Sequence, residues 1–369
     1  MEWHVWDFPD TVRVYFNEDF RIELFTLLKG NSSRNRLAKK FGISTSIIKS
    51  YFQTGKDSEG LKTYIPVKII KRIPYILSIS TNSEFMLRLE KNIVAYRARA
   101  GWAVTNPILP IKETSELYSI VAHMICDGSA GKRKTPCYYN TCKELRENLK
   151  KCLQVFGNVE TNEYEVQNDV YAVMFPKGIT DILSHVFQVP FVRTPYLPKL
   201  FFTAPKECQF AALRAMFDDE GCISGNQLTF AQKEIGVMND LKSLLESIEI
   251  KTGKITKDGK GCKSITVLSE SRKLFWNLIG FLHPVKNKRL KITVKNDIER
   301  RSRKLLIEKI NELFCKENNL TRTEICKKLN SNINSTTELL YRLKKDGKVN
   351  SKFVGKNKSY LWSTASSSE

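Results

Sequence analysis

The sequence predicts a mixed α+β protein whose central region contains the same structural unit twice, with an additional helical segment at each end. Two nine-residue stretches, 120–128 and 213–221, both end in an acidic residue followed by glycine. Each is followed by the same order of helix-like and strand-like stretches, which indicates an internal repeat. The 369 residues suffice for two or three domains, and the 41% hydrophobic content favours a folded chain over a disordered one.

The net charge of the chain limits the classes of molecule that it is expected to bind. Lys and Arg number 60 against 39 Asp and Glu, which gives a formal net charge of +21. A positive field of this size favours a polyanion partner: nucleic acid first, an anionic membrane surface second, with a basic soluble protein lacking such a partner as the third alternative. No apolar run reaches the roughly 18 residues that a spanning helix needs, which weakens the membrane interpretation.

The first residues and the cysteines indicate a reducing compartment. Residues 1–6 have the character of neither a signal peptide nor a transit peptide, so we expect a cytoplasmic, nucleoid-associated protein. Nine cysteines occur without any CxxC pair. His123 and Cys126 have a spacing that zinc can use, but no second ligand pair follows at finger-like distance. Free thiols are therefore expected, and a zinc site is not.

The segment 1–85 is predicted to be a helix-turn-helix-like domain. Two short helices meet at Gly42, apolar residues such as Leu37 and Phe41 supply a small core, and Ser44 or Thr45 begins the second helix. The alternative is a plain helical hairpin packed on the next domain. Residues 86–112 contain prolines that disfavour helix in the preceding residues, so we expect an extended linker there.

The segment 300–364 is predicted to be a winged-helix-like domain. Helices are expected over 304–314, from a capping box at Thr321 to 329, and over 335–343, and two strands then alternate over 347–354 and 359–362. The alternative is a helical brace packed on the core. Three lysines of the expected wing are candidate DNA contacts: Lys352, Lys356 and Lys358.

The two central units are predicted to span 113–203 and 204–297. Each begins with a helix that has alanine at the third place of the motif, Ala122 or Ala215. Strand-like stretches, a helix, two further strand-like stretches and another helix follow the acid–glycine pair. The expected order is αββαββα in each unit, with one connection between elements that the sequence does not define clearly.

These paired motifs resemble those of the LAGLIDADG (DOD-type) homing endonucleases, in the single-chain form with two motifs. The lead-in at 194–207 and the closing segment at 279–290 are also similar to that family, and together the match covers roughly half of the chain. Two departures are Ile125 at the sixth motif position and His123 in place of an apolar residue, for which we expect a packed core position. The terminal His-Asn of an intein is absent, so a freestanding protein is expected.

The resemblance implies that the two motif helices pack at a pseudo-twofold axis and bring Asp127 and Glu220 together as catalytic metal ligands. Close carboxylates repel unless a cation lies between them, and hard oxygen ligands suit Mg²⁺ (or Mn²⁺), which can activate water. An ordinary cap or surface position is the alternative, but matching acids in both copies favour the site. Lys286 and Lys288 are candidates for assisting catalysis, and the sequence does not choose between them.

The resemblance also implies two antiparallel sheets that form a saddle for the DNA major groove. For any single residue, an ordinary solvated strand face is the alternative. The candidate groove-facing residues are Arg133, Lys134, Tyr138, Asn140, Asn226, Gln227, Thr229, Gln232, Lys254, Thr256, Lys257 and Lys263.

The function expected from these features is site-specific, metal-dependent cleavage of double-stranded DNA at a long asymmetric target by a monomer with internal pseudo-twofold symmetry. Two alternatives use the same scaffold: a transcriptional regulator that binds DNA without cutting it, and an RNA maturase that binds intron RNA. Retention of both acids favours the endonuclease, because a DNA clamp does not need unpaired carboxylates facing a polyanion.

Overall fold

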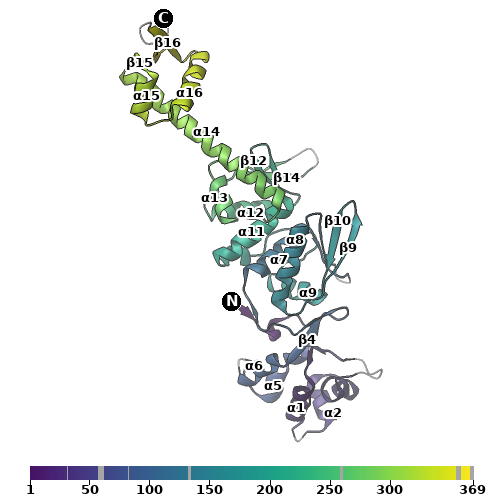
Figure 1. Cartoon of the computed structure of the whole chain (residues 1–369). Helices are drawn as coiled ribbons and strands as arrows, with labels where there is room; N and C mark the ends of the chain where they lie inside the picture. The colour runs from purple at the N-terminus through teal and green to yellow at the C-terminus, as the bar shows by residue number, and fades with distance from the viewer. Residues whose placement is uncertain are drawn as a thin grey trace. The chain divides into compact units, whose positions relative to one another are not determined.

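The computed structural model of the protein describes residues 1–30, 32–56, 62–81, 83–131, 134–257, 261–354 and 359–365. The chain divides into two compact units, 1–290 and 291–369 (Figure 1). Within the described residues, no helix is long and apolar enough to cross a membrane.

The predicted internal repeat is confirmed in unit 1. The first copy consists of α7 (Ser115–Cys126), β7 (Gly128–Ser129), β8 (Cys137–Asn140), α8 (Lys143–Leu153), β9 (Asn162–Gln167), β10 (Val170–Met174) and α9 (Lys177–Val186). The second consists of α11 (Lys206–Glu220), β11 (Gly221–Ser224), β12 (Gln227–Gln232), α12 (Ile235–Glu246), β13 (Thr256–Lys257), β14 (Lys263–Val267) and α13 (Arg272–Leu278). The short segment α10 (Leu200–Thr203) precedes α11.

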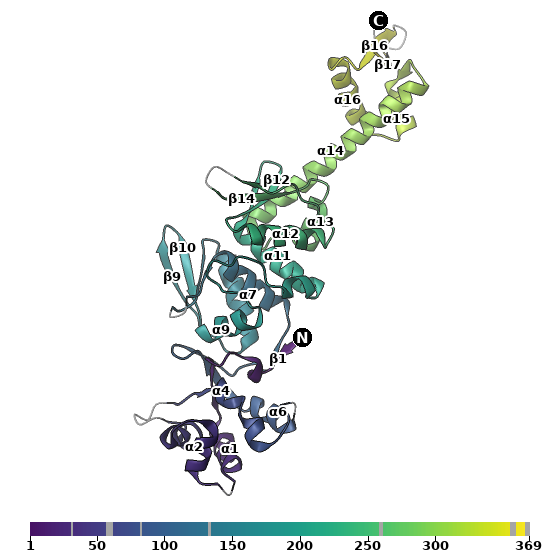
Figure 2. The ribbon, with the colours of Figure 1, turned by 180° about the vertical axis from the view of Figure 1, so that it is seen from behind.

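Both antiparallel sheets have the same strand order, β7-β8-β10-β9 and β11-β12-β14-β13. Figure 2 shows β9 and β10 of the first sheet and β12 and β14 of the second. The connection that the sequence did not define clearly is the hairpin between β11 and β12. Gly225 adopts a positive φ of 55° there, which breaks one expected strand into two. The repeat therefore follows αββαββα in both copies.

The motif helices α7 and α11 pack closely, with Ala122 and Ala215 buried as the small-residue pattern predicts. The two acid–glycine pairs require glycine because there is no room for a side chain at that position. A side chain at Gly128 would collide with the backbone of Met124, and one at Gly221 with that of Phe217. The first strand of each sheet therefore begins directly against the last turn of its motif helix.

The N-terminal part of unit 1 contains more sheet than expected. Strands β2 (Arg13–Phe16), β3 (Ile65–Pro66), β4 (Ile93–Arg97) and β5 (Ala103–Thr105) form a sheet in the order β3-β2-β4-β5. Strand β1 (Glu2–Trp3) pairs with β6 (Ile111–Lys112). The expected linker over 86–112 is thus wrong, because the buried alternation of 93–97 directs these residues into the sheet despite the prolines that follow.

Short helices connect the strands β2, β3 and β4 of this sheet. They are α1 (Glu18–Lys29), α2 (Arg34–Phe41), α3 (Thr45–Ile48), a π-helical turn (Lys49–Thr54), α4 (Val67–Ile70), α5 (Ile73–Leu77) and α6 (Glu84–Lys91). Gly42 ends α2 in the left-handed region, and the Ser44 side chain accepts a hydrogen bond from the Ile47 amide at the start of α3. The two helices thus meet at the turn expected from the sequence.

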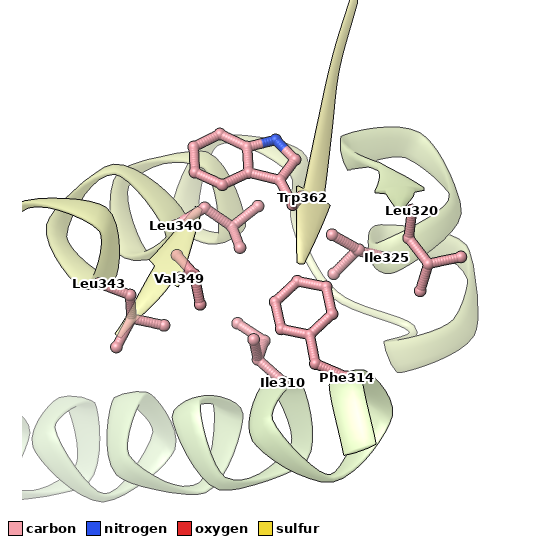
Figure 3. Packing of buried hydrophobic residues seen from close by; sticks show 8 residues of the cluster. All are labelled: Ile310, Phe314, Leu320, Ile325, Leu340, Leu343, Val349 and Trp362. Carbon is pink, nitrogen blue, oxygen red and sulfur yellow. The ribbon is translucent and has the colours of Figure 1, made fainter. Parts of the chain in front are cut away.

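Helix α14 (Pro284–Lys316) contains the boundary between the units. Unit 2 continues with β15 (Leu320–Thr321), α15 (Arg322–Leu329), α16 (Ile333–Lys345), β16 (Val349–Val354) and β17 (Ser359–Thr364), and its sheet has the order β15-β17-β16. The Thr321–Glu324 capping box is present. The unit has a hydrophobic core of its own, in which Ile310, Phe314 and Trp362 meet (Figure 3).

Candidate active site

Asp127 and Glu220 lie at the C-terminal ends of the two packed motif helices. Asp127 is the C-cap of α7, and Glu220 is the last residue of α11. Burial raises the pKa of Asp127 to about 7, and the carboxylates of Asp219 and Glu220 add to this rise. Burial, followed by the Asp219 carboxylate, raises the pKa of Glu220 to about 7. This is the electrostatic signature of crowded acids, which a cation between them would relieve.

Each acid receives an amide from the second strand of its own repeat. Asn140 Nδ2, at the end of β8, donates to Asp127 Oδ2 at 3.2 Å. Gln232 Nε2, at the end of β12, donates to Glu220 Oε1 at 3.4 Å. Asn140 and Gln232 were expected to face the DNA groove, but their amides contact the acids.

A third carboxylate, Asp219, links the two repeats. Its side chain is fully buried, its Oδ2 lies 2.9 Å from His123 Nδ1, and its Oδ1 accepts a hydrogen bond from the Tyr138 hydroxyl at 2.7 Å. Asn140 Nδ2 also donates to it at 3.3 Å. The amide that contacts Asp127 in the first repeat is therefore held by an acid from the second.

His123 is buried, as expected, and it is also ionically paired. Burial opposes protonation of the imidazole, but the carboxylates of Asp219, Asp218 and Asp127 outweigh it and raise the pKa of His123. Asp219 was not among the site residues expected from the sequence. The available signal was a pair of polar residues at interior positions of the two motifs, where apolar and small residues are usual.

Tyr138 was expected on the groove face, and this is wrong. Its side chain is fully buried, and its ring centroid lies 5.0 Å from that of His123. Tyr138 follows the inward register of β8, opposite buried Val173 of β10. The side chain therefore serves the helix interface and cannot reach a base edge.

The structure separates the two candidate lysines. Lys286 Nζ donates to the carbonyl oxygens of Phe217 at 3.4 Å and Asp219 at 3.2 Å, and also to that of Asp218. These carbonyls end α11, where a cation is favourable. Burial lowers the pKa of Lys286 despite the nearby carboxylates. Lys288, by contrast, is exposed.

Asp218 has a structural position at the start of the next helix. Its carboxylate accepts backbone N–H bonds from Leu282 at 3.0 Å and His283 at 2.9 Å, immediately before α14. Burial raises its pKa to about 6, and the two N–H donors oppose the rise. This sixth-position acid is thus not aimed at the metal site, in line with the resemblance.

The remaining candidate DNA contacts differ in orientation. Gln227 and Thr229 lie on the solvent face of β12, because buried Leu228 and Phe230 alternate with them. Lys263 is half-buried, follows the register of Gln232, and donates from its ammonium to the Lys233 carbonyl. Exposed or half-buried positions are occupied by Lys134, Asn226, Lys254, Thr256, Lys257 and Lys352. Arg133, Lys356 and Lys358 lie outside the described residues.

A hollow of about 520 Å³ lies beside Glu220 and has walls from both repeats, including Gly128 and Gln232. In the described ranges, no group of three or more His, Cys, Asp or Glu side chains could hold a metal. The Glu220 carboxylate lines this hollow, and Gly128, the neighbour of Asp127, lines it too. Such a donor set fits Mg²⁺, which typically keeps several waters and takes one or two protein carboxylates. The donor set therefore suits a hard divalent cation and does not suit zinc.

Comparison with known proteins agrees with this geometry. Residues 207–305 match the family model described as a LAGLIDADG-like domain. This segment is thus similar to LAGLIDADG-like domains. The match confirms the resemblance for the second motif, because the matched segment includes α11 from Glu207 onward, Glu220 and the whole second sheet.

Several solved LAGLIDADG structures are similar to part of the chain. A mesophilic variant of the homing endonuclease I-DmoI is 11% identical over 45% of this chain and 94% of its own, with a TM-score of 0.35. I-WcaI bound to its DNA recognition sequence is 14% identical over 56% and 91%, with a TM-score of 0.37. The N-terminal LAGLIDADG domain of DUF199/WhiA is 14% identical over 47% and 86%, with a TM-score of 0.33. No curated protein gives a significant match.

Proposed function

We propose that the chain is a site-specific double-stranded DNA endonuclease that hydrolyses phosphodiester bonds with a divalent metal held by Asp127 and Glu220. One observation carries the proposal. Two acids end two packed helices at matching positions, and crowding and burial raise the pKa of both carboxyls to about 7. Two buried carboxylates close together destabilise the fold when no cation lies between them. An acid at the matching position of each copy therefore favours a role in binding a cation.

The side chains around the acids have distinct tasks in this proposal. Asp127 and Glu220 bind Mg²⁺ or Mn²⁺, and Asn140 and Gln232 fix the orientation of the two carboxylates through their amides. When bound, the cation supplies an activated water and stabilises charge on a phosphate oxygen. Lys286 adds positive charge beside the reacting phosphate while it holds the end of α11.

The two half-sites are chemically different. The first has an aspartate with an asparagine, and the second has a glutamate with a glutamine. The solvent faces of the two sheets also differ in sequence, so an asymmetric DNA target fits a single chain better than a palindrome does. Gln227 and Thr229 present amide and hydroxyl groups that can bond base edges.

The flanking segments are proposed to add DNA contacts. Helices α2 and α3 meet at Gly42, and unit 2 has three helices followed by a hairpin. These element orders support a helix-turn-helix and a winged helix as the proposed binding modules. Lys352 is exposed on that hairpin. Such contacts position a protein on DNA and raise affinity without chemistry at the acids.

The decisive experiment is incubation of the full chain with a randomised duplex library and Mg²⁺, followed by sequencing of the bound and the cut molecules. The proposal expects one long asymmetric consensus in both pools, and Asp127→Asn to give the bound pool only. A bound consensus without cut molecules from the unaltered chain would favour a non-cleaving regulator. Binding confined to structured RNA would favour a maturase.

A further inference from the structure

A groove of about 840 Å³ lies in unit 1 away from the acids. One wall is the loop between β4 and β5, including Arg99 and Trp102. The other comes from the first LAGLIDADG repeat, including Lys134 and Lys177. We propose that this groove binds the phosphodiester backbone of DNA as it leaves the sheet of the first repeat. This inference rests on the proposed DNA-binding function and assigns it a further surface.

The β4–β5 hairpin is firmly attached to the first repeat, so the groove has two fixed walls. Gly178 near the start of α9 lies so close to β4 that an added Cβ would sit 3.2 Å from the Ala98 nitrogen. At the other strand, Thr105 and Asn158 exchange backbone hydrogen bonds of 2.8 and 3.2 Å. A side chain at Gly157 would come within 2.6 Å of the Asn106 carbonyl oxygen.

The charges of the groove favour an anion. Lys177 is already paired with Asp181, the acid of this groove, at 2.5 Å. Arg99 and Lys134 are exposed, and within the described part of the chain neither of them forms an ion pair. Two unneutralised cations on facing walls fit successive phosphates, because an arginine fork and a lysine ammonium both bind phosphate oxygens.

Trp102 adds an apolar surface to these cations. Its side chain is 41% exposed and lines the groove. An indole left open to water beside two free cations suits a ligand that alternates charged and apolar parts. The sugar–phosphate backbone has this character, with phosphates for Arg99 and Lys134 and a deoxyribose face for the indole.

The position of the groove agrees with the path of DNA over the first sheet. Lys134 and Thr135 precede β8, whose last residue, Asn140, contacts Asp127. Six residues of extended chain span at most about 20 Å. At about 3.4 Å per base pair along each strand, Lys134 would reach phosphates within roughly six base pairs of the acids. Arg99 lines the same groove.

The test measures binding of the full chain, without divalent metal, to a duplex recovered from the library selection. Arg99→Ala and Lys134→Ala should each reduce the log–log salt slope of the binding constant by about 0.9. Trp102→Ala should weaken binding about 5-fold or more, and Trp102→Phe should recover most of the loss. Lys91→Ala is the matched control, because Lys91 is also exposed in the N-terminal segment but does not line the groove.

Hydroxyl-radical footprinting of the same complexes locates the contact. The Arg99 and Trp102 variants should lose protection at one end of the footprint only, with circular dichroism and thermal unfolding unchanged. If these variants keep the slope and the footprint of the unaltered chain, the groove assignment is refuted and DNA binding by the saddle stands. If the unaltered chain does not bind duplex DNA, the proposed function itself fails.

Discussion

Removing Asp219 should destabilise unit 1 severely, although Asp219 is not one of the proposed metal ligands. The Asp219→Ala change takes away the partner of buried His123 and the acceptor of the Tyr138 hydroxyl. Breaking a buried ion pair by deleting one member typically costs about 3–5 kcal/mol, because the other charge stays buried without compensation. The exposed pair of Asp10 and Lys71 provides the control, and Asp10→Ala should cost less than about 1 kcal/mol.

Urea unfolding followed by tryptophan fluorescence measures this difference, since four of the five tryptophans lie in unit 1. With a urea m-value of about 3 kcal/mol/M, the midpoint for Asp219→Ala should fall by roughly 1 M or more. A double-mutant cycle with His123→Ala isolates the pair, and the two changes together should cost clearly less than the sum of their separate effects. Additive effects, or a midpoint shift no larger than that of Asp10→Ala, would refute the assigned pairing.

Three further predictions concern the acids and unit 2. Asp127→Asn or Glu220→Gln should abolish cleavage and keep target binding intact or tighter; cutting at the unaltered rate by either variant contradicts the metal-site assignment. The folded pKa values of about 7 for Asp127 and Glu220 lie above their ordinary values of 3.8 and 4.5. The metal-free folded state therefore binds extra protons, and its stability falls as pH rises from about 4 to 7. Mg²⁺ should consequently raise the melting temperature more at pH 8 than at pH 5, and an equal rise at both pH values counts against the site. Finally, a chain ending near Asp297 should stay folded, cut the same bonds and bind roughly 100-fold more weakly with a footprint shortened at one end; aggregation or unchanged affinity would make unit 2 a brace.

The repeat and its acids were predictable because they depend on local pattern. A helix that ends in acid–glycine, repeated 93 residues later with the same succession of elements, specifies both Asp127 and Glu220. The glycine at each motif end was also expected, although its physical cause is close packing on Met124 and Phe217 and not a left-handed turn. The order of helices and strands in unit 2 was predictable for the same reason, since its capping box and strand alternation are local signals.

The rest of the site depends on orientation at the ends of strands. Asn140 and Gln232 terminate strands whose polar residues all suit a solvated face, and the register alone directs their amides toward the acids. The Asp219–His123 pair joins residues 96 apart, so no periodicity within one helix reveals it. The β4–β5 hairpin was missed because prolines just beyond it outweighed a short alternating stretch.

The interior carboxylate of α11 makes the two halves non-interchangeable. Among the described residues, the hydrogen-bond partners of the Asp219 carboxylate all come from the first repeat, and the matching positions of the second repeat are Met216 for His123 and Phe230 for Tyr138. Two copies of the second repeat, joined face to face, would bury a carboxylate against a thioether and a phenyl ring, neither of which can donate a hydrogen bond to it. A chimera that pairs this half with a foreign one must therefore import the imidazole and the phenol as well. The two repeats are therefore no longer equivalent, and neither can take the place of the other.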